Sequence, residues 1–303
     1  MKGNRFRLPI SLIILGWAFF VNSCSFNWMF FQPTKIPKGV TKFAVKTPKD
    51  TMWMVFSKGT YQPVFFTKNK DTIKQSFDLS SVVFISSDGD SLNGWFMRSK
   101  TVKPQVTLLH CHGNAGFVLS QYQGMMPFLD KGFQVFIFDY SGYGFSTGRP
   151  TRKNVLKDAI SAVKYIKSRP EVAGTKLVIY GQSLGGHLSA VVAEREQEEI
   201  DGLVMEGAFS SCPDMGAHVV PVLGRLLVKK SYSANESIRK FHKPVLIIHS
   251  TEDEVVPFYM GKKLFERANT PKEFYEIKHC HICGPEYYSV EIAGKIKMML
   301  GIK

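Results

Sequence analysis

The sequence contains only five cysteines, too few for the disulfide scaffold of a small secreted domain. It also shows no internal repeat. Its net charge of +14 forms no compact basic stripe with interleaved aromatic residues, so nucleic acid is not an expected partner. The remaining composition, 44% hydrophobic and 21% charged, fits one globular domain with an appendage.

The appendage is the N-terminus. Three basic residues precede an almost wholly apolar run over residues 8–21, about 14 residues and short of the ~20 that span a bilayer. The pattern predicts a secretory signal over residues 1–23. It also resembles a bacterial lipoprotein signal, which implies that Cys24 becomes the lipidated first residue. An uncleaved membrane anchor and plain cleavage remain as alternatives, and each leaves the domain extracytoplasmic or on a membrane.

The rest of the chain divides into a linker and a domain. Residues 24–50 include a stretch rich in proline, lysine and threonine, which predicts a linker leading into a domain over residues 51–303. Residues 52–97 have a strand-like pattern, with a hairpin turn at Asp88-Gly89-Asp90.

Beyond this hairpin, predicted strands and helices alternate. Strands are expected at residues 106–109, 134–138, 176–180, 202–205, 245–248 and 273–277, and helices include residues 154–167, 258–268 and 287–300. This order predicts an α/β fold with a mostly parallel sheet that is covered by helices on both faces. In such sheets, functional sites form at the carboxyl ends of the strands.

The most informative motif is Gly181-Gln182-Ser183-Leu184-Gly185, between a predicted strand and a predicted helix. A G-x-S-x-G sequence in this context is typical of a nucleophile elbow. Glycines are needed because a Cβ at either flanking position would clash with neighbouring backbone. The turn exposes the serine oxygen at a helix N-terminus, where negative charge is favoured. Ser183 is therefore the predicted nucleophile; the alternative is a structural elbow on a fold that has lost its chemistry.

A serine nucleophile needs a base that takes its proton and an acid that orients the base. Candidate residues follow the last two predicted strands. Three acids, Glu252, Asp253 and Glu254, come after one strand, and His279 and His281 come after the other.

Four segments together carry a family resemblance. They are His-Gly-Asn-Ala-Gly at 112–116, Asp-Tyr-Ser-Gly-Tyr-Gly at 139–144, the elbow, and Asp-Glu-Val-Val-Pro at 253–257. On these segments the chain resembles the α/β-hydrolases from about residue 80 to the end. It is most similar to short-lid serine hydrolases, which include depalmitoylase-like members and bacterial relatives grouped with the serine aminopeptidases. The resemblance implies an α/β-hydrolase fold with N-terminal antiparallel strands and a short lid over about residues 211–240.

The resemblance also implies roles for individual residues. Asp253 is the acid, with Glu206 as the alternative acid; a third interpretation has Asp253 only cap the following helix. His281 is the base, with His279 as the alternative. The family usually has Gly-His at this point, where this chain has Cys280-His281.

The same comparison implies that the backbone N–H groups of Leu184 and Asn114 form the oxyanion hole. His112 is expected to hold the oxyanion loop by a side-chain hydrogen bond. Cys280-x-x-Cys283 has the spacing of a zinc or redox site, but the second cysteine pair of closed zinc sites is absent. We therefore expect no metal and no cofactor, with the zinc and redox interpretations as alternatives.

Together these features predict a serine hydrolase, carboxylesterase-like or thioesterase-like, that cleaves carboxylic esters or thioesters through a Ser-His-Asp triad and an acyl-enzyme. The expected partners are a small-molecule or acylated substrate and a membrane surface, reached through the N-terminal anchor. One alternative is an amidase or aminopeptidase with the same triad. Another is a catalytically inactive interaction module of the cell envelope.

Overall fold

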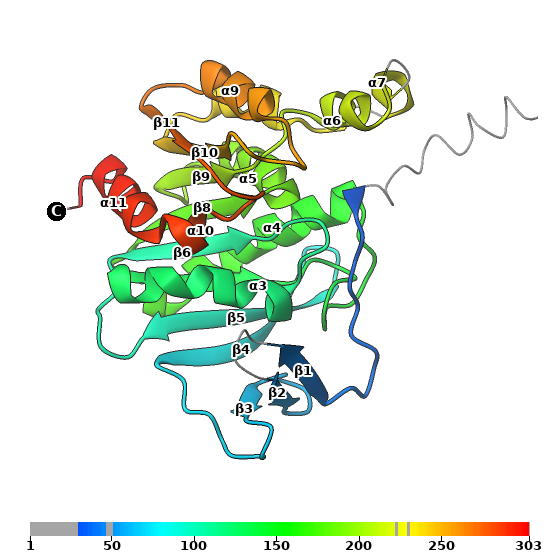
Figure 1. Cartoon of the computed structure of the whole chain (residues 1–303), viewed down its shortest axis with the longest axis vertical. Coiled ribbons are helices and arrows are strands. Elements are labelled where there is room, and N and C mark those ends of the chain that lie inside the picture. Colours follow the sequence, from blue (N-terminus) through cyan, green and yellow to red (C-terminus); the bar gives the residue numbers. More distant parts are fainter. Residues whose placement is uncertain (1–29, 47–50, 222–223, 229–230, 303) are drawn as a thin grey trace, which may run out of the picture.

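The computed structural model describes residues 30–46, 51–221, 224–228 and 231–302 (Figure 1). The expected signal at residues 1–23 and the candidate lipidation site Cys24 lie outside the described residues. None of the helices in the described part combines the length and the apolar character needed to cross a membrane.

An eight-stranded sheet forms the centre of the molecule, in the order β11-β10-β9-β8-β6-β7-β5-β4. Its strands are β4 (Phe77–Ile85), β5 (Ser91–Ser99), β6 (Val106–Cys111), β7 (Phe133–Phe138), β8 (Lys176–Gln182), β9 (Gly202–Glu206), β10 (Val245–Ser250) and β11 (Lys272–Ile277). Strands β6 to β11 pair in parallel, and β5 pairs antiparallel with both β4 and β7. The predicted parallel strands and the hairpin are confirmed.

Helices cover both faces of the sheet. Successive side chains of a strand point to opposite faces, and here the side chains on both faces are apolar and packed under helices. Leu109 packs in a core that includes helices α4 (Arg152–Lys167), α5 (Leu184–Arg195) and α9 (Phe258–Arg267). Its neighbour Leu108 packs in a second core with α3 (Val118–Met125), the 3-10 helix η2 (Met126–Lys131) and α11 (Ser289–Met299). The strands between these layers read as apolar runs because both of their faces are buried. The expected architecture is confirmed.

A separate three-stranded antiparallel sheet precedes the main one. It consists of β1 (Lys42–Lys46), β2 (Thr51–Phe56) and β3 (Pro63–Phe66), and it lies below β4 in Figure 1. Strand β1 lies within residues 24–50, where the sequence predicts a linker. In its register Phe43 pairs with Met54, so the strand adds to a face whose Met54 and Phe56 are buried. The composition of the linker concealed this alternation.

Residues 211–240 contain the short helices α6 (Cys212–Val219), α7 (Gly224–Leu227) and α8 (Ala234–Ser237) and the 3-10 helix η4 (Ile238–Lys240). Asp214 of α6 accepts hydrogen bonds from Lys263 of α9 (2.7 Å) and from Ser210 (2.7 Å), and it pairs with Arg225 of α7. Burial alone would raise the pKa of Asp214, but the hydrogen bonds from Lys263 and Ser210 lower it to about 2. One ionised carboxylate thus links α6 to α7 and α9.

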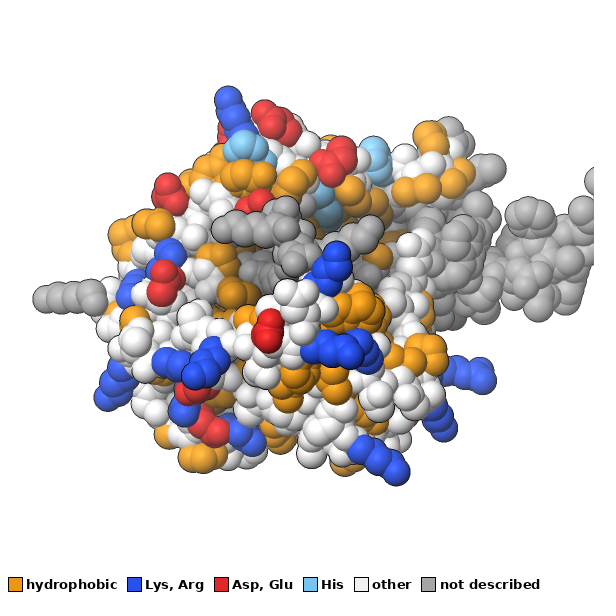
Figure 2. All heavy atoms as spheres, turned by 60° about the horizontal axis from the view of Figure 1, so that its bottom comes forward, with side chains coloured by type: hydrophobic (Ala, Val, Ile, Leu, Met, Phe, Trp, Pro, Cys, Tyr) orange, Lys and Arg blue, Asp and Glu red, His pale blue; other side chains and the backbone are white. Residues whose placement is uncertain are grey.

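On the face drawn in Figure 2, Lys and Arg side chains are spread out between apolar and acidic side chains.

Candidate active site

Ser183 lies at the turn between β8 and α5. Its backbone angles are φ 55° and ψ −117°, an arrangement that a residue with a side chain adopts only when its surroundings hold it there. Two hydrogen bonds do so: its N–H donates to the carbonyl of Glu206 (2.9 Å), and its carbonyl accepts from the N–H of His187 (3.0 Å). The strand, sharp turn and helix that the motif predicts are all present.

The glycines of the motif are required by close backbone approach. A Cβ on Gly181 would lie 2.4 Å from the carbonyl oxygen of Gly185, and one on Gly185 would lie 1.9 Å from that of Cys111. The loop after β6 lies against the same turn, because a Cβ on Gly113 would be 3.6 Å from the Cβ of Ser183. The loop that carries Asn114 is therefore beside the candidate nucleophile.

Asp253 and His281 meet although they come from different loops. The Nδ1 of His281 lies 2.7 Å from Oδ2 of Asp253, whose side chain is 1% exposed. Oδ1 of Asp253 accepts from the N–H groups of Val255 (2.9 Å) and Val256 (2.7 Å). One carboxylate thus orients the imidazole and holds its own loop. The other ring nitrogen of His281, Nε2, is buried and has no hydrogen-bond partner among the described residues.

A second histidine supports the carboxylate. Nε2 of the buried His249 donates to the carbonyl of Val256 (2.9 Å) and lies 3.3 Å from Oδ2 of Asp253. Burial alone would raise the pKa of Asp253, but hydrogen bonds from His249 and His281 bring it well below its usual range. Sequence reasoning missed His249, and the only signal was a polar residue near the end of an apolar strand.

The alternative base and the neighbouring acids have other contacts. The ring of His279 stacks on Tyr287, with 4.2 Å between ring centroids. Carboxylate oxygens of Glu252 and Glu254 accept from the backbone N–H groups of His279 (3.0 Å) and His281 (3.2 Å). Of the three acids in this loop, Asp253 is the one that contacts the imidazole of a candidate base.

Glu206, the alternative acid, is buried at the end of β9 and bonds elsewhere. Its Oε1 accepts from the N–H of Gly284 (2.6 Å), and its Oε2 accepts from the hydroxyl of Tyr180 (2.8 Å) and Nε2 of Gln182 (2.8 Å). No hydrogen bond joins its carboxylate to the ring of His281 among the contacts of the described residues.

Cys280 and Cys283 form a disulfide that closes the loop containing His281. These two sulfurs are therefore bonded to each other rather than to a metal. Within the described ranges, no group of three or more His, Cys, Asp or Glu side chains is arranged to hold a metal ion. Cys111 is a buried free thiol, and burial raises its pKa to about 12.

The histidines of the β6 strand and loop are fully buried. Nε2 of His110 donates to Oε1 of Gln182 (3.0 Å), and Nδ1 of His112 donates to the carbonyl of Gly113 (2.8 Å). Burial lowers the pKa of His110 to about 4 and that of His112 to about 3. Both rings are thus neutral near pH 7, and His112 makes the expected hydrogen bond to its loop.

The chain before β1 crosses the Asn114 loop. Oδ1 of Asn114 accepts from the N–H of Gln32 (2.7 Å) and from the hydroxyl of Tyr143 (3.4 Å). Close by, the N–H of Gly144 donates to the carbonyl of Thr34 (2.9 Å). The contacts of Gln32 and Thr34 use main-chain groups, so no residue pattern in the sequence could have indicated them.

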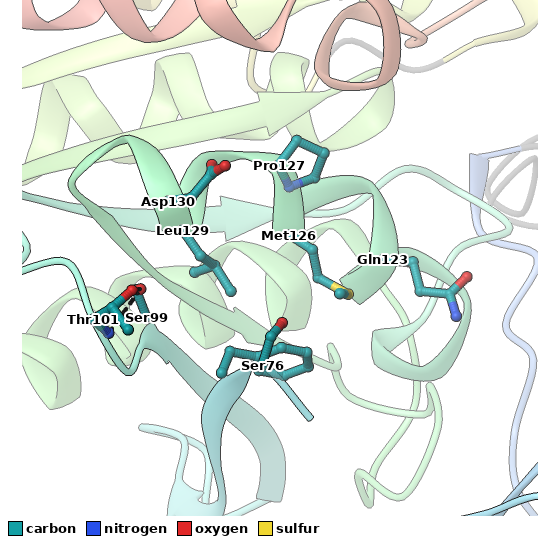
Figure 3. Close-up of a pocket in the computed structure, with 9 residues that line it drawn as sticks. Ser76, Ser99, Thr101, Gln123, Met126, Pro127, Leu129 and Asp130 are labelled. Atoms are coloured by element: carbon teal, nitrogen blue, oxygen red, sulfur yellow. Dashed lines mark hydrogen bonds between the residues drawn. The ribbon is translucent and has the colours of Figure 1, made fainter. Parts of the chain in front are cut away.

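One hollow of about 530 Å³ lies away from these residues, between the outer strands and η2 (Figure 3). Figure 3 shows Met126 and Leu129 of η2 directed toward Ser76, which precedes β4. Ser99 also lines the hollow and is the last residue of β5. Because β5 runs antiparallel to β7, the end of β5 lies where β7 begins. The hollow is therefore at the opposite edge from Ser183.

Comparisons with known proteins agree with this architecture. Residues 106–227 match a family model described as alpha/beta hydrolase fold. The protein bem46 of Schizosaccharomyces pombe is 32% identical over 294 residues, covering 93% of this chain and 88% of bem46. The uncharacterized protein YfhR of Escherichia coli strain K12 is 34% identical over 197 residues, covering 63% of this chain and 69% of YfhR.

Solved structures with the same fold include esterases. The Pyrococcus furiosus esterase Pf2001 superimposes with a TM-score of 0.64 at 18% identity, covering 90% of this chain and 97% of the esterase. Est1E from Butyrivibrio proteoclasticus, solved with ferulic acid, gives a TM-score of 0.59 at 20% identity over 71% of this chain and 96% of Est1E. At these identities the likeness establishes the fold, which supports hydrolase activity.

Proposed function

Since the chain belongs to the alpha/beta hydrolase family, we propose that it is a serine hydrolase that cleaves carboxylic esters or thioesters. The observation that supports this most is the 2.7 Å contact between Asp253 and His281, on the same edge of the sheet as the strained turn at Ser183. The second ring nitrogen of His281 remains available to exchange a proton with the serine.

In the proposed reaction, Nε2 of His281 takes the proton of the Ser183 hydroxyl as its oxygen bonds to the substrate carbonyl carbon. Asp253 fixes the ring orientation and stabilises the imidazolium that forms. The backbone N–H groups of Leu184 and Asn114 donate to the oxyanion.

Collapse of the tetrahedral intermediate breaks the bond to the alcohol or thiol, which takes the proton from His281. Water then attacks the acyl-enzyme by the same route, releases the carboxylic acid and restores Ser183.

The experiment is a panel of p-nitrophenyl esters and thioesters of graded chain length, assayed beside aminoacyl anilides. Faster turnover of esters or thioesters than of anilides supports the proposal. Preferential cleavage of anilides supports an amidase instead. A folded protein that turns over none of them and resists a fluorophosphonate probe supports an inactive interaction module.

We also propose that the protein is anchored to a membrane on the extracytoplasmic side through a lipid on Cys24. The sequence around Cys24 supports this, and the packing of Phe30 indicates where such an anchor would hold the domain. Phe30 is buried, with its ring centroid 6.0 Å from that of Phe209, which follows β9. Phe30 follows Cys24 by six positions, which a chain can span over at most about 20 Å. A lipid on Cys24 would therefore hold the candidate active site near the membrane surface.

Labelled fatty acid provides the test of this anchor. Incorporation into the wild-type protein and its loss in Cys24→Ser support lipidation. A Cys24→Ser protein of unchanged size that stays with membranes after a high-salt wash points to an uncleaved anchor.

A further inference from the structure

Glu206 has no part in the proposed triad, yet it contacts both sides of it. It lies on β9, where it pairs with Gln182 of β8 on one side and with Ile248 of β10 on the other. Its main-chain carbonyl accepts from the N–H of Ser183 (2.9 Å), and its Oε1 accepts from the N–H of Gly284 (2.6 Å). One residue therefore holds the nucleophile turn with its backbone and the loop of the base with its side chain.

The loop of the base needs such an attachment. His279 and Ile282 have φ values of 77° and 54°, so backbone on either side of His281 has a conformation that side chains disfavour. At its start, the loop is held by Glu252 and Ser250, which contact the main chain of His279. Its end is held by Glu206 at Gly284 and by Gln182, whose Nε2 donates to the carbonyl of Ile282 (3.3 Å).

The carboxylate of Glu206 is buried without an ion-pair partner among the described residues. Its three donors are the Gly284 N–H, the Tyr180 hydroxyl and the Gln182 amide, and Gln182 is fixed in turn by His110. Burial raises the pKa of Glu206, which these hydrogen bonds and the charge of His281 oppose. A carboxylate costs more to bury than an amide, so packing alone does not explain an acid here.

We propose that Glu206 is a positioning residue, which fixes the loop of His281 against the turn of Ser183 and places a second negative charge beside the imidazolium. The inference rests on the proposed function, in which that imidazolium forms. The groups around the histidine are Asp253 at its ring, Glu254 at its backbone N–H, Glu252 and His279 in the flanking loops, and His249 behind Asp253. Glu206 joins this set through Gly284, which follows His281 by three positions.

Two substitutions separate the charge from the attachment. Glu206→Gln keeps the shape but removes the charge, so the acid limb of the kcat/KM pH profile should shift toward lower pH by roughly half a unit or more. The amide oxygen still accepts from the N–H of Gly284, so the attachment remains, and the plateau rate should fall less than in Glu206→Asp. Glu206→Asp keeps the charge but shortens the side chain, so the rate should fall while the acid limb stays at the wild-type pH.

Asp158→Asn is the matched control, since Asp158 of α4 is also a buried carboxylate and accepts from the N–H of Ser141 (2.8 Å). Its acid limb should remain that of the wild type. Thermal unfolding of each variant shows which proteins are folded. If Glu206→Gln folds poorly, Glu206→Asp still tests the attachment, and a wild-type rate in that variant overturns the proposal.

NMR titration of the His281 ring in wild type and Glu206→Gln needs no substrate. If the midpoint moves to lower pH in Glu206→Gln but the wild-type protein hydrolyses no ester, the role of Glu206 is supported and the proposed function is not. An unchanged midpoint, or a folded Glu206→Gln protein with wild-type rate and acid limb, overturns the inference.

Discussion

Asp253 and His281 are 28 residues apart in sequence, and their side chains meet with 2.7 Å between Oδ2 and Nδ1. Strands β10 and β11 pair in parallel, so the loops that follow them leave the sheet at the same edge. This contact occupies Nδ1 of His281 and leaves Nε2 as the nitrogen that the proposed reaction would use.

Asp253→Asn should lower kcat by about 10⁴-fold, because an amide at this position favours the wrong tautomer of the imidazole. The substitution changes little volume, so the protein should remain folded. Steady-state kinetics with circular dichroism as the folding control provide the measurement. Activity within about tenfold of wild type would mean that Asp253 does not orient the base.

The two histidines of the last loop should differ sharply. His281→Ala should lose about 10⁴-fold in rate, since its ring is the one that contacts Asp253. His279→Ala removes a ring that stacks on Tyr287 and should retain most activity. The comparison uses the best ester of the panel, and the opposite ranking would reassign the base to His279.

Much of the candidate site could be predicted from the sequence, because the motif and the order of strands are both typical of a serine nucleophile with an acid and a base. An elbow after a buried strand predicts the position of Ser183, and the order serine, acid, histidine predicts the loops of the other two residues. The choices between Asp253 and Glu206 and between His281 and His279 came from family resemblance. Only side-chain contacts distinguish these candidates, because all four residues lie at or just after the carboxyl ends of parallel strands.

Other features were beyond sequence reasoning for physical reasons. Strand β1 depends on pairing with β2, which local composition does not encode. The contact of Gln32 with Asn114 uses a backbone N–H. His249 follows the strand predicted at residues 245–248 and is part of β10 in the structure. The spacing of Cys280 and Cys283 was compatible with zinc or redox chemistry. Only the folded loop shows that the two cysteines form a disulfide.

The carboxylate of Asp214, which links α6 to α7 and α9, should make stability depend on pH. The pKa of Asp214 is lowered to about 2, so its stabilisation is present above the ordinary value of about 3.8 and is lost as pH falls toward 2. The free energy of unfolding of wild type should therefore exceed that of Asp214→Asn at pH 6 and approach it near pH 2. Urea unfolding of both proteins across this range is the measurement, and a difference that persists at pH 2 would contradict the account.

The disulfide in the loop of the base should affect turnover. Reduction with dithiothreitol frees the ends of the segment that carries His281, and a displacement of about 1 Å can cost ~10²-fold in rate. We expect kcat to fall on reduction and to recover on reoxidation. A Cys280→Ser/Cys283→Ser protein should have the rate of the reduced wild type, and dithiothreitol should not change that rate. Equal rates for the oxidised, reduced and double-serine proteins would show that the bridge does not position the base.

The central claim, that Ser183 is an activated nucleophile, is tested most directly by a fluorophosphonate probe followed by peptide mass spectrometry. A fluorophosphonate reacts with a serine oxygen that a neighbouring base has activated, so its adduct identifies the residue. The account predicts one adduct on Ser183, loss of labelling in a folded Ser183→Ala protein, and strongly slowed labelling in His281→Ala. A folded wild-type protein that takes no label, or carries it on another serine, would contradict the account.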